Sequence, residues 1–122
     1  MMNNRYVGDC YEVLAEGYLQ KRGYRILERN FRCKFGEVDI IAMHQGAIVF
    51  VEVKYRATAD FGSPTDAVNR QKQIRISNVA SFYMYSRKQY TNRSCRFDVV
   101  SIIGGNVTLY QNAFPYCGRF AR

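Results

Sequence analysis

Three charged residues stand within or directly after two apolar segments, where an ordinary protein core would reject them. Asp39 lies inside the first segment, and Glu52 and Lys54 close the second. The two segments, 38–43 and 48–53, are rich in Val, Ile and Phe. Two carboxylates and an ammonium group can bind a divalent cation and stabilise negative charge on a phosphate ester. Function is therefore expected to centre on these three residues.

The spacing of the two segments predicts a β-hairpin with a fixed register. Gln45 and Gly46 between them are typical of a tight turn in which glycine supplies a positive φ. Whether the loop has two residues or four, symmetry about the turn places Asp39 opposite Glu52. One face of the hairpin is predicted to hold Glu37, Asp39, Ile41, Ile48, Phe50, Glu52 and Lys54, and the other face Val38, Ile40, Ala42, Val49, Val51 and Val53.

Opposed carboxylates at Asp39 and Glu52 require a positive partner. Side chains at such paired positions have Cβ atoms roughly 4.5 to 5.5 Å apart, and like charges there repel. Mg²⁺ bound by one or two carboxylates with waters and phosphate oxygens removes the repulsion, and Lys54 could then orient the attacking water. The alternative is the solvated face of an ordinary hairpin, with Glu37 and Lys54 as an exposed ion pair. The run 48–51, apolar on both faces, favours a buried central strand, but the motif alone leaves both interpretations open.

The same residues resemble known protein families. The spacing from Asp39 to Glu52 and Lys54 resembles the PD-(D/E)-x-K signature of the restriction-endonuclease-like nucleases. A closer similarity is to the YraN-like family of small bacterial proteins, and it covers nearly all of the chain as far as residue 110. The segments that carry this second resemblance are 18–19, 23–30, 36–42, 49–56, 72–76 and 96–100.

The resemblance implies an α/β fold of the restriction-endonuclease-like type, with a central mixed β-sheet flanked by helices, related to the Holliday-junction resolvases. It implies that Asp39, Glu52 and Lys54 occupy active-site positions and that the two acids hold Mg²⁺ or Mn²⁺. The family usually has Gly-Glu early in its first helix, and this chain has Tyr11 and Glu12 there. Glu12 is therefore expected to be an auxiliary catalytic or metal-binding acid, although the residues alone favour a solvent-facing position.

The overall composition predicts one basic domain. The chain has 122 residues, with 18 basic and 10 acidic side chains and a net charge of +8. A domain this small and basic is expected to attract polyanions, nucleic acid first and anionic membrane second. There is no apolar run of about 18 residues to span a membrane and no signal-peptide pattern after Met1. A cytoplasmic location without a membrane partner is therefore expected.

Periodicity and turn residues predict the elements around the hairpin. Residues 1–110 are expected to form one nuclease-like domain, and 111–122 a tail that is loose or laid along the surface. Gly23 is expected to end the first helix, and Ser63 to cap the second. We expect helices over 4–22 and from Ser63 to Tyr85, an outer strand over 24–31, an exposed loop over 86–94, and a second hairpin of 95–103 with 107–110.

Four basic residues lie after the hairpin and along the second helix. Arg56 directly follows the second strand, and Arg70, Lys72 and Arg75 cluster in the first half of the expected helix. They form either a solvated helix face or, since the intervening loop starts directly after Arg56, a surface near the acids that contacts nucleic-acid phosphates.

Three kinds of residue are assigned structural positions. Asp98, within the strand 95–103, is expected to pair with a nearby arginine rather than to bind a metal. His44, at the hairpin turn, is expected to be exposed rather than catalytic. The four cysteines lack the spacing of a zinc site and are expected to be free thiols.

The leading hypothesis is a Mg²⁺- or Mn²⁺-dependent nuclease acting on DNA. In it, Asp39 and Glu52 bind the metal, Lys54 orients the water, and Glu12 assists. The second hypothesis is a nucleic-acid-binding module of the same fold that does not cleave, and the third is a scaffold protein whose basic face meets an acidic protein. A second copy of the chain is a further candidate partner, giving a homodimer.

Overall fold

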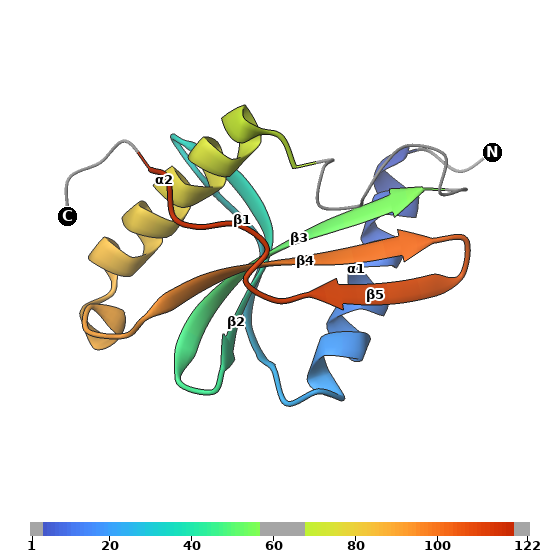
Figure 1. Cartoon of the computed structure of the whole chain (residues 1–122), viewed down its shortest axis with the longest axis horizontal. Coiled ribbons are helices and arrows are strands. Elements are labelled where there is room, and N and C mark those ends of the chain that lie inside the picture. Colours follow the sequence, from blue (N-terminus) through green and yellow to red (C-terminus); the bar gives the residue numbers. More distant parts are fainter. Residues whose placement is uncertain (1–3, 57–67, 119–122) are drawn as a thin grey trace.

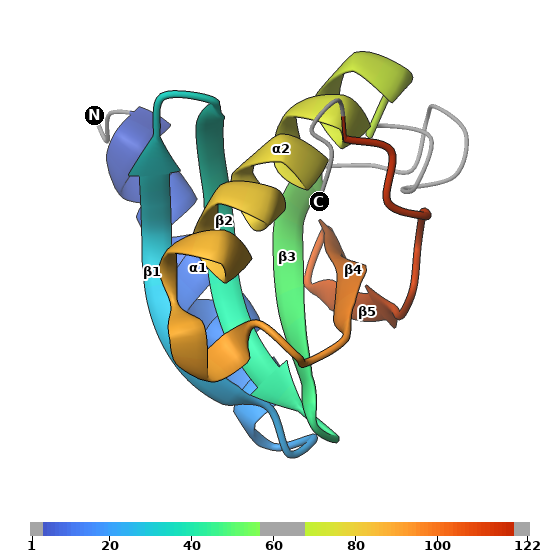
Figure 2. The same ribbon diagram turned by 90° about the vertical axis from the view of Figure 1, so that its left-hand side faces the viewer.

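The computed structural model describes residues 4–56 and 68–118. Within them, a five-stranded sheet in the order β1-β2-β3-β4-β5 lies between two α-helices, α1 on one face and α2 on the other (Figure 1, Figure 2). This confirms the predicted α/β fold with a central mixed sheet, which is consistent with a restriction-endonuclease-like architecture. The elements are α1 (Asn4–Gln20), β1 (Arg25–Cys33), β2 (Gly36–His44), β3 (Ala47–Arg56), α2 (Arg70–Ser86), the short 3₁₀ helix η2 (Lys88–Tyr90), β4 (Cys95–Ile103) and β5 (Asn106–Tyr110).

The sheet is antiparallel except at its centre, where β3 and β4 run parallel. Parallel neighbours need a crossover connection, and α2 lies within that connection. The edge strands β1 and β5 pair antiparallel with β2 and β4, respectively. β3 is therefore the central strand predicted from its two apolar faces, and the first seven of its ten residues are buried.

Helix α1 ends where the sequence predicts. Gly23 has a φ of 87°, a left-handed conformation that glycine adopts without steric cost. Its N–H donates to the carbonyl of Gln20 at 3.1 Å, and the N–H of Tyr24 donates to the carbonyl of Leu19 at 3.1 Å. These two bonds are the paired hydrogen bonds of a Schellman cap, which satisfy the last carbonyls of the helix.

The predicted hairpin register is confirmed. The turn has two residues, Gln45 and Gly46, with φ values of 51° and 82°, as a type I′ turn requires. Ile41 pairs with Phe50, and the pairing of the two strands stops at Ile40 opposite Val51.

The predicted face of Val38 is wrong. Val38 packs with Ile41 and Phe50 on the α2 side of the sheet, whereas Ile40 packs on the α1 side. The alternation is interrupted between Val38 and Ile40, and at this position of the neighbouring strand Asn30 has a φ of 53°, outside the β region. The β1-β2 ribbon is curved (Figure 2).

The start of the second helix is also different from the prediction. Ser63 lies outside the described residues, and α2 begins after Asn69, so a helix running unbroken from Ser63 is wrong. Asn69 has an extended backbone, and its side-chain oxygen accepts a hydrogen bond from the N–H of Lys72 at 2.8 Å. This bond satisfies one of the first unpaired donors of the helix, so Asn69 is the true cap.

Residues 111–118 lie against α2 and β4 as an irregular segment. Phe114 is buried and stacks on Phe97 with ring centroids 5.0 Å apart. The Tyr116 hydroxyl lies 2.7 Å from the Ser81 hydroxyl, and the N–H of Cys117 donates to Ser77. In the described part of the chain, no helix has the length and apolar character needed to cross a membrane.

Candidate active-site cleft

An open cleft of about 430 Å³ lies where β2 and β3 part. The backbone pairing of these strands stops at Ile40 and Val51, so Asp39 and Glu52 fall just beyond the last paired residues. We call this hollow the acidic cleft, and Asp39 with Glu52 the acidic pair. The cleft is lined by Glu12 from α1, by Gly36, Glu37 and Asp39 from β2, by Glu52, Val53 and Tyr55 from β3, and by Lys72, Arg75 and Ile76 from α2.

Asp39 reaches into the gap between the two strands. Its Oδ2 accepts a hydrogen bond of 2.8 Å from the backbone N–H of Val53, which fixes the carboxylate where a strand-to-strand bond would otherwise lie. Burial, then the charge of Glu52 and a hydrogen bond with it, raise the pKa of Asp39 to about 9, while the Val53 N–H opposes the shift. The acidic pair is thus poised to share a proton or a cation.

Glu52 is 4% exposed because β3 is covered on both faces. Two ammonium groups compensate its charge: Lys72 Nζ from α2 contacts Oε2 directly, and Lys54 Nζ lies 3.7 Å from the same oxygen. Burial, and then Lys72, lower the pKa of Lys54 despite the attraction of Glu52. Burial also acts to lower the pKa of Lys72, but the Glu52 carboxylate and the contact with Lys54 raise it on balance.

The structure brings together most of the predicted site residues. Asp39, Glu52 and Glu12 line one cleft with Lys72 and Arg75, and Lys54 adjoins Glu52. Both acids face the same cleft, as the hairpin register predicted.

Two predicted basic residues stand apart from the cleft lining. Arg70 is exposed at the first residue of α2, and Arg56 is the last residue of β3, where its carbonyl accepts a bond from the N–H of Gly104. The alternative interpretation, an exposed ion pair of Glu37 with Lys54, does not match the structure. Glu37 binds Arg32 of β1 at 2.7 Å, and Lys54 pairs with Glu52.

Sequence reasoning missed two features of the cleft. Lys72 was assigned to phosphates, but in the structure it neutralises Glu52. Tyr55 was not assigned, but it lines the cleft and stacks on Tyr11 with ring centroids 4.2 Å apart. Tyr55 lies directly beside Lys54 in sequence, and this adjacency to the acidic motif was the available signal.

The acidic pair suits a hard divalent cation. Carboxylate oxygens are ligands that Mg²⁺ and Mn²⁺ prefer, and Mg²⁺ commonly takes one or two of them with waters and substrate phosphate. Among the described residues, no group of three or more His, Cys, Asp and Glu side chains is arranged to hold a metal. The donor set therefore fits an open site shared with substrate, and does not fit a closed structural site.

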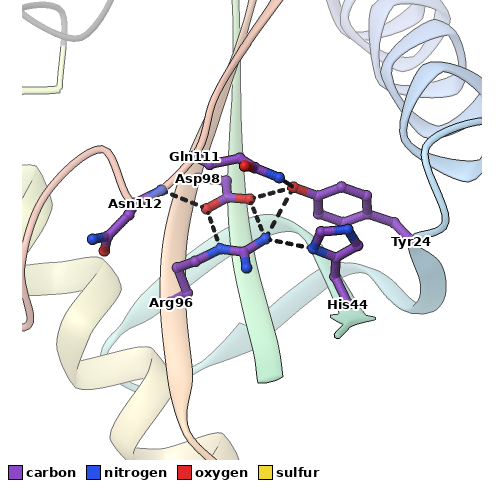
Figure 3. Close-up of polar contacts among 6 residues, drawn as sticks. All are labelled: Tyr24, His44, Arg96, Asp98, Gln111 and Asn112. Carbon is purple, nitrogen blue, oxygen red and sulfur yellow. Dashed lines mark hydrogen bonds and ion pairs between the residues drawn. The ribbon is translucent and has the colours of Figure 1, made fainter. Parts of the chain in front are cut away.

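Asp98, which lies beside Val51 of β3 in the sheet, belongs to a separate buried network (Figure 3). It is fully buried and accepts two hydrogen bonds of 2.9 Å from Arg96. The Tyr24 hydroxyl donates to it at 2.7 Å, and the N–H of Asn112 donates at 2.9 Å. The predicted pairing of Asp98 with an arginine is confirmed.

His44 is part of the same network, so its predicted exposure is wrong. Its ring is 7% exposed and stacks on Tyr24 with centroids 4.0 Å apart. Arg96 Nη2 lies 2.9 Å from His44 Nδ1. Because a guanidinium can only donate, Nδ1 accepts this bond, and the ring is the neutral tautomer protonated at Nε2. The hairpin turn is covered because β1 and β4 bring Tyr24 and Arg96 over it.

The raised pKa of Asp39 predicts a pH-dependent stability. The folded protein holds a proton there up to about pH 9, whereas the unfolded carboxyl loses it near its ordinary value of 3.8. This group therefore lowers the free energy of unfolding progressively as pH rises between those values. Asp39→Asn keeps an oxygen for the Val53 N–H, so it is expected to lose that slope and to equal or exceed wild-type stability at high pH.

Urea unfolding of both proteins at several pH values between 5 and 9 measures this effect. The difference between wild type and Asp39→Asn reports this carboxyl together with the groups that interact with it, Glu52 first. A variant that becomes less stable than wild type as pH rises would show that the Asp39 charge stabilises the fold.

The chain matches the model of the Uncharacterised protein family UPF0102 over residues 11–102, which include every residue lining the acidic cleft. It is 44% identical over 117 residues to a UPF0102 protein of Lachnoclostridium phytofermentans, covering 96% of this chain and 99% of that protein. It is 49% identical over 100 residues to a UPF0102 protein of Clostridium acetobutylicum, covering 82% and 81%. A solved structure titled "Crystal structure of SSO0001" is 17% identical, with a TM-score of 0.46, over 87% of this chain and 50% of that chain.

Proposed function

Since the chain belongs to the uncharacterised protein family UPF0102, we propose from the acidic cleft that it hydrolyses phosphodiester bonds of nucleic acid, with DNA as the expected substrate and Mg²⁺ or Mn²⁺ as cofactor. The family membership agrees with the YraN-like resemblance of the sequence. We propose in addition that the chain is related to the restriction-endonuclease-like nucleases.

The observation that carries the proposal is the convergence of Asp39 and Glu52 in one cleft beside Lys54. Burying two carboxylates together is costly, and burial and Glu52 raise the pKa of Asp39. A fold that needed only stability would gain by replacing Asp39 with an amide. The presence of both carboxylates at the gap between β2 and β3 supports a role in binding a cation and a phosphate.

Each residue of the cleft has a separate role in this proposal. Asp39 and Glu52 would hold the cation, which when bound supplies Lewis-acid stabilisation of the phosphate and activation of water. The N–H of Val53 keeps the Asp39 carboxylate in place. Lys54 carries only donors when charged, so it holds the attacking water by its oxygen or stabilises the developing negative charge. Glu12 lines the cleft as an auxiliary acceptor.

Lys72 and Arg75 give the cleft its cationic wall. Both come from the first half of α2 and line the cleft. Lys72 compensates Glu52 in the absence of a divalent cation, and a cation at the acidic pair would free this ammonium for the phosphate. The same arrangement favours the second candidate function, a binding module that does not cleave, because Glu52 is already neutralised by two lysines.

Metal binding is tested by thermal melts with and without Mn²⁺. A ligand that binds only the folded state stabilises it by about 2.7 kcal/mol at a concentration of 100 times its dissociation constant, so wild type is expected to melt several degrees higher with Mn²⁺. Asp39→Asn and Glu52→Gln are expected to show no such shift, and Asp39→Asn is expected to be no less stable than wild type without metal.

The matched control is Glu37→Gln, which changes an acid of the same cleft that binds Arg32 and should keep the metal shift. A paired structural charge predicts the opposite pattern, with a loss of about 3 to 5 kcal/mol on truncation. That loss, together with no metal shift in wild type, would remove the catalytic proposal and leave the binding module.

Nucleic-acid affinity is expected to depend on Lys72 and Arg75 and to fall steeply with salt. Each phosphate contact contributes a slope of about −0.7 to log K against log salt on single-stranded nucleic acid, so Lys72→Ala with Arg75→Ala should reduce the slope by about 1.4 on a single-stranded oligonucleotide. The control is Lys21→Ala with Lys88→Ala, which removes the same charge from exposed positions outside the cleft. Equal slopes in the two double variants would place the binding surface elsewhere.

A further inference from the structure

Two tyrosine rings are stacked at the rim of the acidic cleft. Tyr11 of α1 and Tyr55 of β3 have centroids 4.2 Å apart and planes inclined by 16°. Tyr55 lines the cleft and is 42% exposed, although the strand before it is buried. Tyr11 covers one face of the Tyr55 ring, and Tyr55 remains partly exposed at the cleft. A flat aromatic surface is thus held in a fixed orientation beside the acids.

The groups around this ring suit a nucleotide. Tyr55 lies three residues beyond Glu52 on the same strand, about 10 Å along it and on the opposite face of the strand, and both residues line the cleft. Lys72 and Arg75 line the same cleft and supply positive charge for a phosphate. A phosphate at the acidic pair would therefore have its own base, or the neighbouring one, within reach of the tyrosine.

We propose that Tyr55, supported by Tyr11, is a stacking subsite for an unpaired nucleobase, so that the nucleic acid bound in the acidic cleft is single-stranded there. The inference rests on the proposed function and specifies its substrate. Stacking on an aromatic ring accepts any base, because every base has a π face. A base inside a duplex is already stacked and must leave the helix before it can meet such a ring. Single strands, flaps and frayed ends fit the cleft, and continuous duplex does not.

Fluorescence anisotropy in EDTA measures this contact without cleavage. Tyr55→Leu is expected to weaken binding of a single-stranded oligonucleotide about 5- to 100-fold, the range for the loss of one stacked base, and to leave duplex binding unchanged. Tyr55→Phe keeps the ring and should bind like wild type. Tyr85→Leu is the matched control, because Tyr85 is an 84% exposed tyrosine at the opposite end of α2 from Lys72.

An abasic scan of the oligonucleotide shows whether a base is the partner. One abasic position should weaken wild-type binding by the same factor as Tyr55→Leu, and that position should have no effect on the variant. The proposal is overturned if the abasic position and Tyr55→Leu weaken binding additively. It is also overturned if no abasic position weakens binding by the wild type, a result that does not depend on how well the variant folds.

Two further outcomes are decisive. If a free nucleoside monophosphate displaces the oligonucleotide at equal concentration, the ring serves free nucleotides and the single-strand proposal is overturned. If the protein fails to cleave with Mn²⁺ while the abasic effect persists in EDTA, hydrolysis is overturned and the stacking subsite stands.

Discussion

Lys54→Met is expected to slow phosphodiester cleavage about 10²- to 10³-fold, the usual cost of removing one preorganised donor from a site of developing charge. Methionine keeps much of the length of the lysine side chain and removes only the charged donor. Because Lys72 still contacts Glu52 in this variant, the fold is expected to tolerate the change. Single-turnover cleavage of a labelled single-stranded oligonucleotide with saturating Mn²⁺ measures the rate.

Lys88→Met is the matched control, because it removes an exposed lysine from η2, outside the cleft. A control rate equal to wild type, with unchanged melting temperatures in both variants, would assign the loss to chemistry. A Lys54→Met rate within a few-fold of wild type would show that Lys54 does not act on the reacting groups, whatever the role of the acids.

Lys54 and Lys72 are expected to differ in which kinetic constant they change. Both contact Glu52, but Lys72 comes from α2 and belongs to the wall proposed to bind phosphate. A residue that binds substrate and transition state equally changes KM, whereas one that acts only in the transition state changes kcat. A change of Lys72 is therefore expected to alter KM, and a change of Lys54 is expected to alter kcat.

The parts of the fold that follow local rules could be predicted from the sequence. Gln45 and Gly46 determine a two-residue turn, and that turn determines the register that brings Asp39 and Glu52 to one cleft. Gly23 ends α1 because the cap needs only a residue that accepts a positive φ. These features depend on a few neighbouring residues, so their physics is visible in the chain itself.

The features that the sequence did not predict depend on residues far apart in the chain. Val38 changes face next to the position of β1 at which Asn30 has a positive φ. The contact of Lys72 with Glu52 requires the position of α2 over the sheet, which helical periodicity does not define. His44 is buried because Tyr24, directly before β1, and Arg96 of β4 cover it.

The half-buried Asp39 and the fully buried Asp98 provide a contrast between a charge proposed to be functional and a structural one. Asp39 lies beside another carboxylate, and its pKa is raised. Asp98 lies beside a guanidinium, and its hydrogen bond is the leading cause that raises the pKa of Arg96. In the first case ionisation works against folding, and in the second the two charges stabilise one another.

Asp98→Ala is therefore expected to lower the free energy of unfolding by about 3 to 5 kcal/mol, because it leaves the Arg96 charge without its partner inside the protein. The total stability of a domain is only about 5 to 15 kcal/mol, so this one change would bring the fold close to unfolding. Denaturant melts compare it with Glu37→Ala, which removes the partner of an exposed arginine and should cost at most about 1 kcal/mol.

A second variant distinguishes the uncompensated charge from the loss of packing. Replacing both partners, with Asp98→Leu and Arg96→Met, removes the buried charges together, and such apolar replacements are often neutral or stabilising. The double variant is expected to recover much of the stability lost in Asp98→Ala, although the Tyr24 hydroxyl and the N–H of Asn112 lose an acceptor. If the double variant is no more stable than Asp98→Ala, the loss of stability comes from these two donors. The pairing of Asp98 with Arg96 would then not be the stabilising interaction.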